Sequence, residues 1–205
     1  DAFYLVSFDL EKLDRMGMDA EKDQIVSAVY IRDVVEDYSG IDPYSGKPGR
    51  YGCGGMDGVS VGPVFGSDKN SPKKIMLAQG IRKDVERTDN DHQILLQYDP
   101  DIFEQYGQPL DQMRPHHCGP EKAEARYFFY TGNTNWGIQN LEYDPATGYW
   151  FTAVYRGVKP QFENYAMFAV DGNLPAINTK LEGRGSETGL LLTSVKFGID
   201  ARGNG

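Results

Sequence analysis

The sequence predicts an all-β fold built from repeated units, and three observations support this. Ten segments have the composition of β-strands, whereas only two short segments suit helices. The chain has 24 glycines and 11 prolines among 205 residues, which favours many turns over a helical bundle. Similar strands also recur at nearly constant spacing, as they do in repeat proteins.

The strand-like segments are rich in β-branched and aromatic residues. Several alternate apolar and polar residues, which is typical of a strand with one solvated face. Others are apolar on both faces, as expected for strands inside stacked sheets. The ten predicted strands are residues 2–9, 24–32, 58–65, 74–82, 93–99, 126–131, 137–143, 149–156, 165–170 and 190–197.

The two predicted helices are residues 10–22 and residues 100–112. Both segments are short and polar, and the first contains Gly17. Helices therefore contribute little to the expected fold.

Three of the strands resemble one another. They begin at Ala2, Lys74 and Tyr149, which are 72 and 75 positions apart. Each is followed by a second apolar strand. This spacing predicts three units of roughly seventy residues each, which fits the length of the chain.

Each unit also has a candidate strand that precedes it. Residues 58–65 precede the strand at Lys74, and residues 137–143 precede the strand at Tyr149. For the first unit, the matching strand is residues 190–197, at the other end of the chain. We therefore expect the two ends of the chain to pair. Such pairing closes a β-architecture and leaves no strand edge open.

The expected organisation is a single domain, residues 1–205, with about three repeats. The repeats are approximately residues 57–99, residues 126–172, and residues 189–205 joined to residues 1–33.

A turn sequence supports the repeat. Residues 144–148 read Asp-Pro-Ala-Thr-Gly, with proline at the second turn position and glycine where a positive φ is needed. An apolar strand, this turn and an aromatic strand together resemble the blades of bacterial β-propellers. The resemblance covers residues 137–172 best and residues 57–99 less well.

The resemblance implies a propeller-like fold, whole or partial, and no particular activity. A four-stranded blade usually takes about 40–50 residues, so these longer units depart from the pattern. Either the loops are long, or the chain is part of a larger propeller. A β-trefoil-like arrangement is the alternative three-fold β fold.

Charge and missing motifs exclude several classes of function. The formal net charge is −9, so phosphate backbones and anionic membranes would be repelled, and we expect no nucleic-acid partner. No apolar run is long enough to span a membrane. The sequence has no P-loop, no dinucleotide-binding glycine motif and no Gly-x-Ser-x-Gly elbow.

The candidate catalytic residues are mostly in the polar segment 82–92. A carboxylate beside a histidine can raise its basicity, and an arginine can hold an anionic group of a substrate. Glu142 would add a second carboxylate for general acid–base chemistry. The alternative is a solvated loop whose charges satisfy one another. The candidates are Arg87, Asp89, Asp91, His92 and Glu142.

A second set of candidates suits a sugar. Trp136 could stack on the apolar face of a sugar ring, while the amides of Gln139 and Asn140 bond its hydroxyls. The alternative is that Trp136 belongs to the core.

His116 and His117 join the ligand-binding candidates, because all three histidines of the chain fall outside the expected strands. No second Cys/His pair has zinc spacing, so no metal site is predicted; a divalent ion remains the alternative. Cys53 and Cys118 either form one disulfide or stay two thiols.

Taken together, these features predict a secreted or cell-surface protein that binds a small molecule or a glycan, with a carbohydrate as the favoured ligand. One alternative is a carbohydrate-active enzyme, either a glycoside hydrolase or a polysaccharide lyase. Another is a scaffold completed by a second chain or by a further copy of itself.

Overall fold

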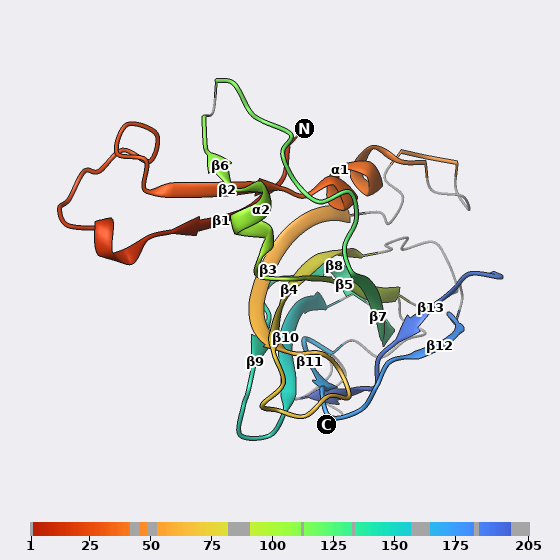
Figure 1. Ribbon diagram of the computed structural model, residues 1–205. Helices are drawn as coiled ribbons and strands as arrows, with labels where there is room; N and C mark the ends of the chain where they lie inside the picture. The colour runs from red at the N-terminus through yellow and green to blue at the C-terminus, as the bar shows by residue number, and fades with distance from the viewer. Residues whose placement is uncertain are drawn as a thin grey trace.

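The computed structural model describes residues 2–41, 46–48, 53–81, 91–111, 113–132, 134–156, 165–182 and 185–197. Most of the regular structure is β-strand, as predicted, and the strands form three sheets (Figure 1). None of the three sheets is closed by the residues that the structure describes. Within the same residues, no helix has the length and apolar character to cross a bilayer.

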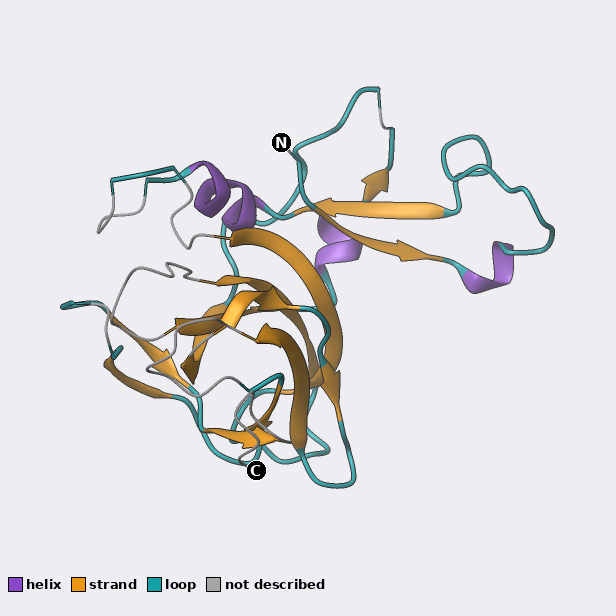
Figure 2. Cartoon of the chain, turned by 180° about the vertical axis from the view of Figure 1, so that it is seen from behind, coloured by secondary structure: helices purple, strands orange, loops and turns teal. Residues whose placement is uncertain are grey.

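The first sheet forms an arm that projects from the body of the molecule, as Figure 2 shows from behind. Its strands are β1 (Tyr4–Phe8), β2 (Val26–Tyr30) and β6 (Gln108–Pro109), in the order β1-β2-β6. β1 and β2 are antiparallel, with Val6 opposite Ala28. The connection between them forms the tip of the arm.

The second sheet is the largest and has six strands. Their order is β12-β13-β7-β5-β4-β3, and β3, β4, β5 and β7 are antiparallel neighbours. β13 runs parallel to β7. The strands are β3 (Cys53–Pro63), β4 (Lys73–Ile81), β5 (Asp91–Tyr98), β7 (Ala125–Gly132), β12 (Ile177–Lys180) and β13 (Thr188–Leu191).

The third sheet packs face to face with the second. Its antiparallel order is β14-β11-β10-β8, and the short β9 also pairs with β10. Its strands are β8 (Thr134–Ile138), β9 (Glu142–Tyr143), β10 (Tyr149–Arg156), β11 (Met167–Asp171) and β14 (Ser194–Phe197).

Two hydrophobic cores hold these layers together. The first lies between the second and third sheets, around Trp150, Phe129 and Phe168. The second lies on the opposite face of the six-stranded sheet. There α1 (Arg32–Ser39), α2 (Ile102–Tyr106) and the root of the arm cover the sheet.

Three predicted couples of strands form antiparallel hairpins: β1 with β2, β4 with β5, and β10 with β11. The preceding strand β3 pairs with β4 as predicted, whereas the predicted strand 137–143 is divided between β8 and β9, both of which pair with β10.

The predicted pairing of the two chain ends is wrong. The segment 190–197 is divided between two strands, β13 and β14, which pair with β7 and β11 respectively. Leu192, between them, is buried in the first core, and its N–H donates to the carbonyl of Phe128. The backbone and apolar side chains of this segment are thus used within the body, and Figure 1 shows β1 in the arm, away from the C-terminal strands.

The helix predicted over residues 10–22 is also wrong, apart from a single 3₁₀ turn, Leu10–Lys12. No residue of that segment is buried, so no apolar face stabilises a helix there. α2 occupies only part of the second predicted helix. α1 and β12 were not predicted.

The predicted turn at residues 144–148 is confirmed. Gly148 has a φ of 77°, in the left-handed region. The carboxylate of Asp144 accepts hydrogen bonds from the backbone N–H groups of Ala146 and Thr147 and from the Thr147 hydroxyl. These bonds stabilise the charged form and hold the pKa of Asp144 below its ordinary value.

Candidate functional site

The candidate site is built first on α1. Ile31 and Val34 are fully buried in the second core, so one side of the helix is held on the six-stranded sheet. Asp33 and Asp37 are four positions apart, which places both carboxylates on one face of the helix.

The six-stranded sheet supplies the groups that meet these carboxylates. Side chains alternate along a strand, so Gln79 of β4 shares a face with Leu77, and Arg126 of β7 shares a face with Phe128. Tyr98 of β5 lies on the same face. Three adjacent strands thus present an amide, a phenol and a guanidinium to α1.

Arg126 bridges the two carboxylates of α1. Its Nη2 atom lies 3.2 Å from Oδ1 of Asp33 and 2.6 Å from Oδ2 of Asp37. The side chain of Asp37 is only 5% exposed and that of Asp33 12%, whereas Arg126 is 24% exposed. This ion pair is therefore far less screened by water than an ordinary surface pair.

Neutral donors complete the arrangement. Gln79 Nε2 donates to Oδ2 of Asp37 at 2.9 Å. The N–H of Ala123 and the hydroxyl of Tyr98 both donate to Oδ2 of Asp33, the latter at 3.4 Å. Burial, and then the nearby charge of Asp33, raise the pKa of Tyr98, so this phenol stays protonated and remains a donor.

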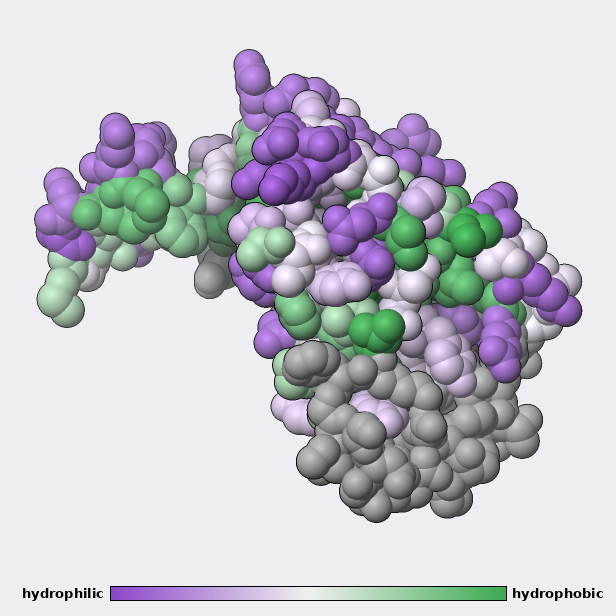
Figure 3. Space-filling view, turned by 90° about the horizontal axis from the view of Figure 1, so that it is seen from below, coloured by the Kyte–Doolittle hydropathy of each residue, from purple (hydrophilic) through white to green (hydrophobic). Residues whose placement is uncertain are grey.

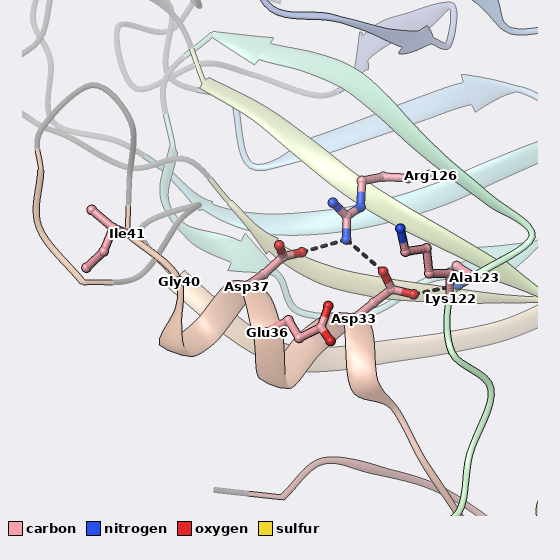
Figure 4. A pocket seen from close by; sticks show the side chains of 8 residues that line it. All are labelled: Asp33, Glu36, Asp37, Gly40, Ile41, Lys122, Ala123 and Arg126. Carbon is pink, nitrogen blue, oxygen red and sulfur yellow. Dashed lines mark hydrogen bonds and ion pairs between the residues drawn. The ribbon is translucent and has the colours of Figure 1, made fainter.

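These residues surround an open pocket of about 530 Å³, which we call the Asp33–Arg126 pocket (Figure 4). Figure 4 shows Arg126 reaching between Asp33 and Asp37 from the sheet side. Glu36 and Lys122 are exposed and lie at the mouth of the pocket. The lining residues are Asp33, Glu36, Asp37, Gly40, Ile41, Lys122, Ala123 and Arg126.

The chemistry of the pocket suits recognition of polar groups. Asp33 and Asp37 are held by hydrogen bonds to Arg126 and Gln79 of the sheet, so a ligand meets these groups already oriented. The described part of the chain contains no group of three or more His, Cys, Asp or Glu side chains placed to hold a metal ion.

The predicted catalytic residues are placed elsewhere. Arg87 and Asp89 lie outside the described residues. Asp91 and His92 belong to β5 and are 2% and 1% exposed, so the prediction that His92 lies in a loop is wrong. The reason is that β5 begins two residues earlier than its apolar pattern indicates, where the ring of His92 packs on Tyr130 with centroids 5.6 Å apart.

Asp91 takes part in a buried polar cluster between the sheets. The backbone N–H of Thr134 donates to Oδ2 of Asp91 at 3.1 Å. Gln93 donates to the hydroxyls of Thr131 and Thr134, at 3.2 Å and 3.0 Å. These bonds join β5 to β7 and β8, so Asp91 has a structural role in holding the strands together.

Of the predicted sugar-binding residues, Trp136 belongs to β8, and Gln139 and Asn140 follow it. Asn140 accepts the N–H of Ala153 at 2.8 Å through its side chain, which closes the connection to β10. Gln139 donates to the carbonyl of Gly137 at 3.1 Å. Glu142 is exposed on β9, and the side chain of Trp136 lies outside the described part.

His116 and His117 lie at the root of the arm. Their rings pack on Tyr4 and Tyr30, with centroid distances of 5.1 Å and 4.7 Å. Cys118 is a free thiol, and the side chain of Cys53 lies outside the described part of the chain. Among the predicted site residues whose side chains the structure describes, none lines the Asp33–Arg126 pocket.

Sequence reasoning missed the residues of this pocket because it missed α1. One signal was present: Ile31, Val34, Val35 and Tyr38 have the spacing of one helix face. That pattern would have placed Asp33 and Asp37 together on the adjoining face.

No protein-family model, no curated protein and no solved structure matches the chain. The functional conclusion therefore rests on the geometry and chemistry of the pocket.

Proposed function

We propose that this protein binds a carbohydrate in the Asp33–Arg126 pocket. The observation that carries the proposal is the pair of carboxylates, Asp37 buried and Asp33 largely buried, that Arg126 bridges at the wall of an open pocket of about 530 Å³. A ligand that enters the pocket meets rigid polar groups, and it need not order them itself.

The balance of charge supports a neutral, hydroxyl-rich ligand. Three acidic and two basic side chains line the pocket, and Arg126 already offsets much of the charge of Asp33 and Asp37. Sugar hydroxyls both donate and accept, so they can bond to the carboxylate of Glu36 and to the ammonium of Lys122. Ile41 and Ala123 are the apolar side chains of the lining. Two such side chains are too few to favour a hydrophobic ligand.

The wider expectations stay part of this proposal. We place the protein outside the cell or on its surface, where an acidic carbohydrate-binding protein would meet glycans. We also propose a propeller-like architecture, whole or partial. The antiparallel runs β3-β4-β5-β7 and β8-β10-β11-β14 support it, since each has the four strands of a blade.

A glycan array followed by calorimetry tests the proposal. Glu36→Gln and Lys122→Met change exposed side chains at the mouth, so both variants should fold normally. Each should weaken binding of the sugar found by about tenfold, because a hydrogen bond to a charged group is lost. Glu121→Gln is the matched control, since this neighbouring residue is exposed and lies outside the lining.

Two results would count against the proposal: no glycan retained by the wild-type protein, or unchanged affinity in both mouth variants. Mass spectrometry of the retained glycan separates binding from turnover. Cleaved product would favour the carbohydrate-active enzyme over a binding protein.

A further inference from the structure

We propose that the outer edge of β1 binds an extended, positively charged segment of another polypeptide as an added antiparallel strand. The surface involved is separate from the Asp33–Arg126 pocket, so this inference is independent of the carbohydrate proposal.

β1 is an edge strand with outward backbone groups. The carbonyl of Phe3 accepts the N–H of Ile31 at 2.9 Å, and the N–H of Asp9 donates to the carbonyl of Ile25. Antiparallel ladders alternate, so the odd-numbered positions of β1 bond to β2. The even-numbered positions then aim their N–H and C=O groups at the open edge; they are Tyr4, Val6 and Phe8.

A groove of about 380 Å³ runs along this edge, between β1 and the outer face of β3. Leu5 and Leu77 are buried at its base, whereas Val6 and Val59 are 43% and 52% exposed. The groove therefore combines a free hydrogen-bonding edge with an apolar floor, which is what an added strand requires. Its lining residues are Tyr4, Leu5, Val6, Met56, Asp57, Gly58, Val59 and Leu77.

Further apolar side chains are exposed on β1, on β3 and on the rest of the arm. Phe8 is 56% exposed on β1, and Val61 is exposed on β3. Figure 3 shows hydrophobic atoms among hydrophilic ones on the projecting arm, where Leu10 and Met16 are also exposed. Exposed apolar side chains gathered beside a groove are typical of interaction sites.

Comparison of the three hairpins indicates what the groove accommodates. The first strand of the second hairpin, β4, carries β3 on its outer edge. The first strand of the third hairpin, β10, carries β8 there. Both added strands are antiparallel. Among the described residues, β1 has β2 as its sole neighbour in the sheet, so its outer edge is the position that β3 and β8 fill elsewhere.

Charge selects the occupant. Asp57 lies exposed in the lining of the groove, and residues 9–24 of the arm contain six acidic and three basic residues. A second copy of the chain would bring the same net charge of −9 and be repelled. A segment with apolar side chains at alternate positions and lysine or arginine between them would fill the groove and be attracted to it.

The test uses the full chain and a fluorescent synthetic peptide in which valine alternates with lysine. Its binding is followed by anisotropy at low ionic strength. We expect saturable binding that is at least about tenfold tighter than that of a scrambled peptide of the same composition. Replacing the lysines by glutamates should abolish binding.

Val6→Pro is the decisive variant. Proline removes an N–H that points away from β2, so the β1–β2 ladder should persist while strand addition is blocked. Val59→Lys, on the other side of the groove, tests the same site without altering the arm. Both should weaken binding at least about tenfold, whereas Ile177→Lys, exposed on β12, should leave it unchanged.

Two results would overturn the proposal. In one, the alternating and scrambled peptides bind alike, or both groove variants bind as the wild type does. In the other, sedimentation shows a dimer that Val6→Pro dissociates, which would make a second copy the occupant.

Discussion

Arg126 connects α1 to the six-stranded sheet through two carboxylates that have little access to water. Removing one partner of a buried ion pair leaves the other charge uncompensated, which costs more than the pair itself contributes. Here two carboxylates depend on the same guanidinium, and Asp37 is the more deeply buried.

Arg126→Met should therefore lower the free energy of unfolding by about 3 kcal/mol, at the low end for a buried pair because Arg126 is partly exposed. Urea denaturation at neutral pH measures this change. Arg114→Met is the control: it breaks the ion pair with Asp111, but Arg114 is 85% exposed, so less than about 1 kcal/mol should be lost. Equal losses in the two variants would show that the bridge does not hold α1 in place.

His116 should make the stability of the protein depend on pH. Burial, and then the neighbouring His117, hold the pKa of His116 below its ordinary value of 6.5. Below that value the unfolded state binds more protons than the folded state, so the free energy of unfolding falls as the pH is lowered. Protonation would also remove the hydrogen bond that Cys118 N–H donates to His116 Nδ1 at 3.1 Å.

We expect the urea concentration at the unfolding midpoint of the wild type to decrease as the pH is lowered from about 7.5 to 5.5. The variant His116→Gln should show a smaller decrease. His117→Gln should keep most of the wild-type decrease, because burial is the larger cause of the shift. A fall of the same size in the His116 variant would mean that other groups produce the pH dependence.

At the scale of elements, β3 depends on small residues where it crosses the third sheet. A Cβ atom on Gly62 would lie 2.6 Å from Cζ2 of Trp150 and 2.8 Å from Cγ of Tyr143. Both rings are buried in the first core and cannot move without disturbing it.

Gly62→Ala should therefore lower the free energy of unfolding by about 1–3 kcal/mol through overpacking. Gly55→Ala, on the same strand, is the control, because the nearest described atom to its Cβ would be Oδ2 of Asp57, at an ordinary 3.5 Å. Thermal unfolding of the two variants compares them directly. Equal melting temperatures of the two variants would contradict the close approach of β3 to Trp150.

At the scale of the whole molecule, the arm and the body should be energetically separate at the tip. No residue between Asp9 and Ile25 is buried, so the tip contributes little to either core. Replacing residues 10–24 with an Asn-Gly turn would join Asp9 to Ile25, whose backbones are already hydrogen-bonded to each other across the ladder.

The free energy of unfolding of the shortened protein, measured in urea, should lie within about 0.5 kcal/mol of the wild-type value. It should also keep the groove beside β1, because the lining residues lie outside the replaced segment. A large loss of stability would show that the tip contributes contacts to the body.

The sequence by itself determined the strands and their local hairpins. Alternating and apolar runs placed β4, β5, β7 and β10 closely, because a strand's pattern depends on its own residues and on which faces are buried. The turn at residues 144–148 was equally predictable, since Asp144 and Gly148 act on their immediate neighbours.

Only the tertiary structure decided how the sheets are completed and where polar groups meet. Leu192 could have belonged to a strand beside β1, but packing between two sheets assigns its neighbours to β7 and β11. Asp33 and Arg126 are far apart in the chain, and they meet because α1 lies on the same sheet face from which Arg126 projects. Such contacts depend on long-range packing, which the local pattern of a sequence does not encode.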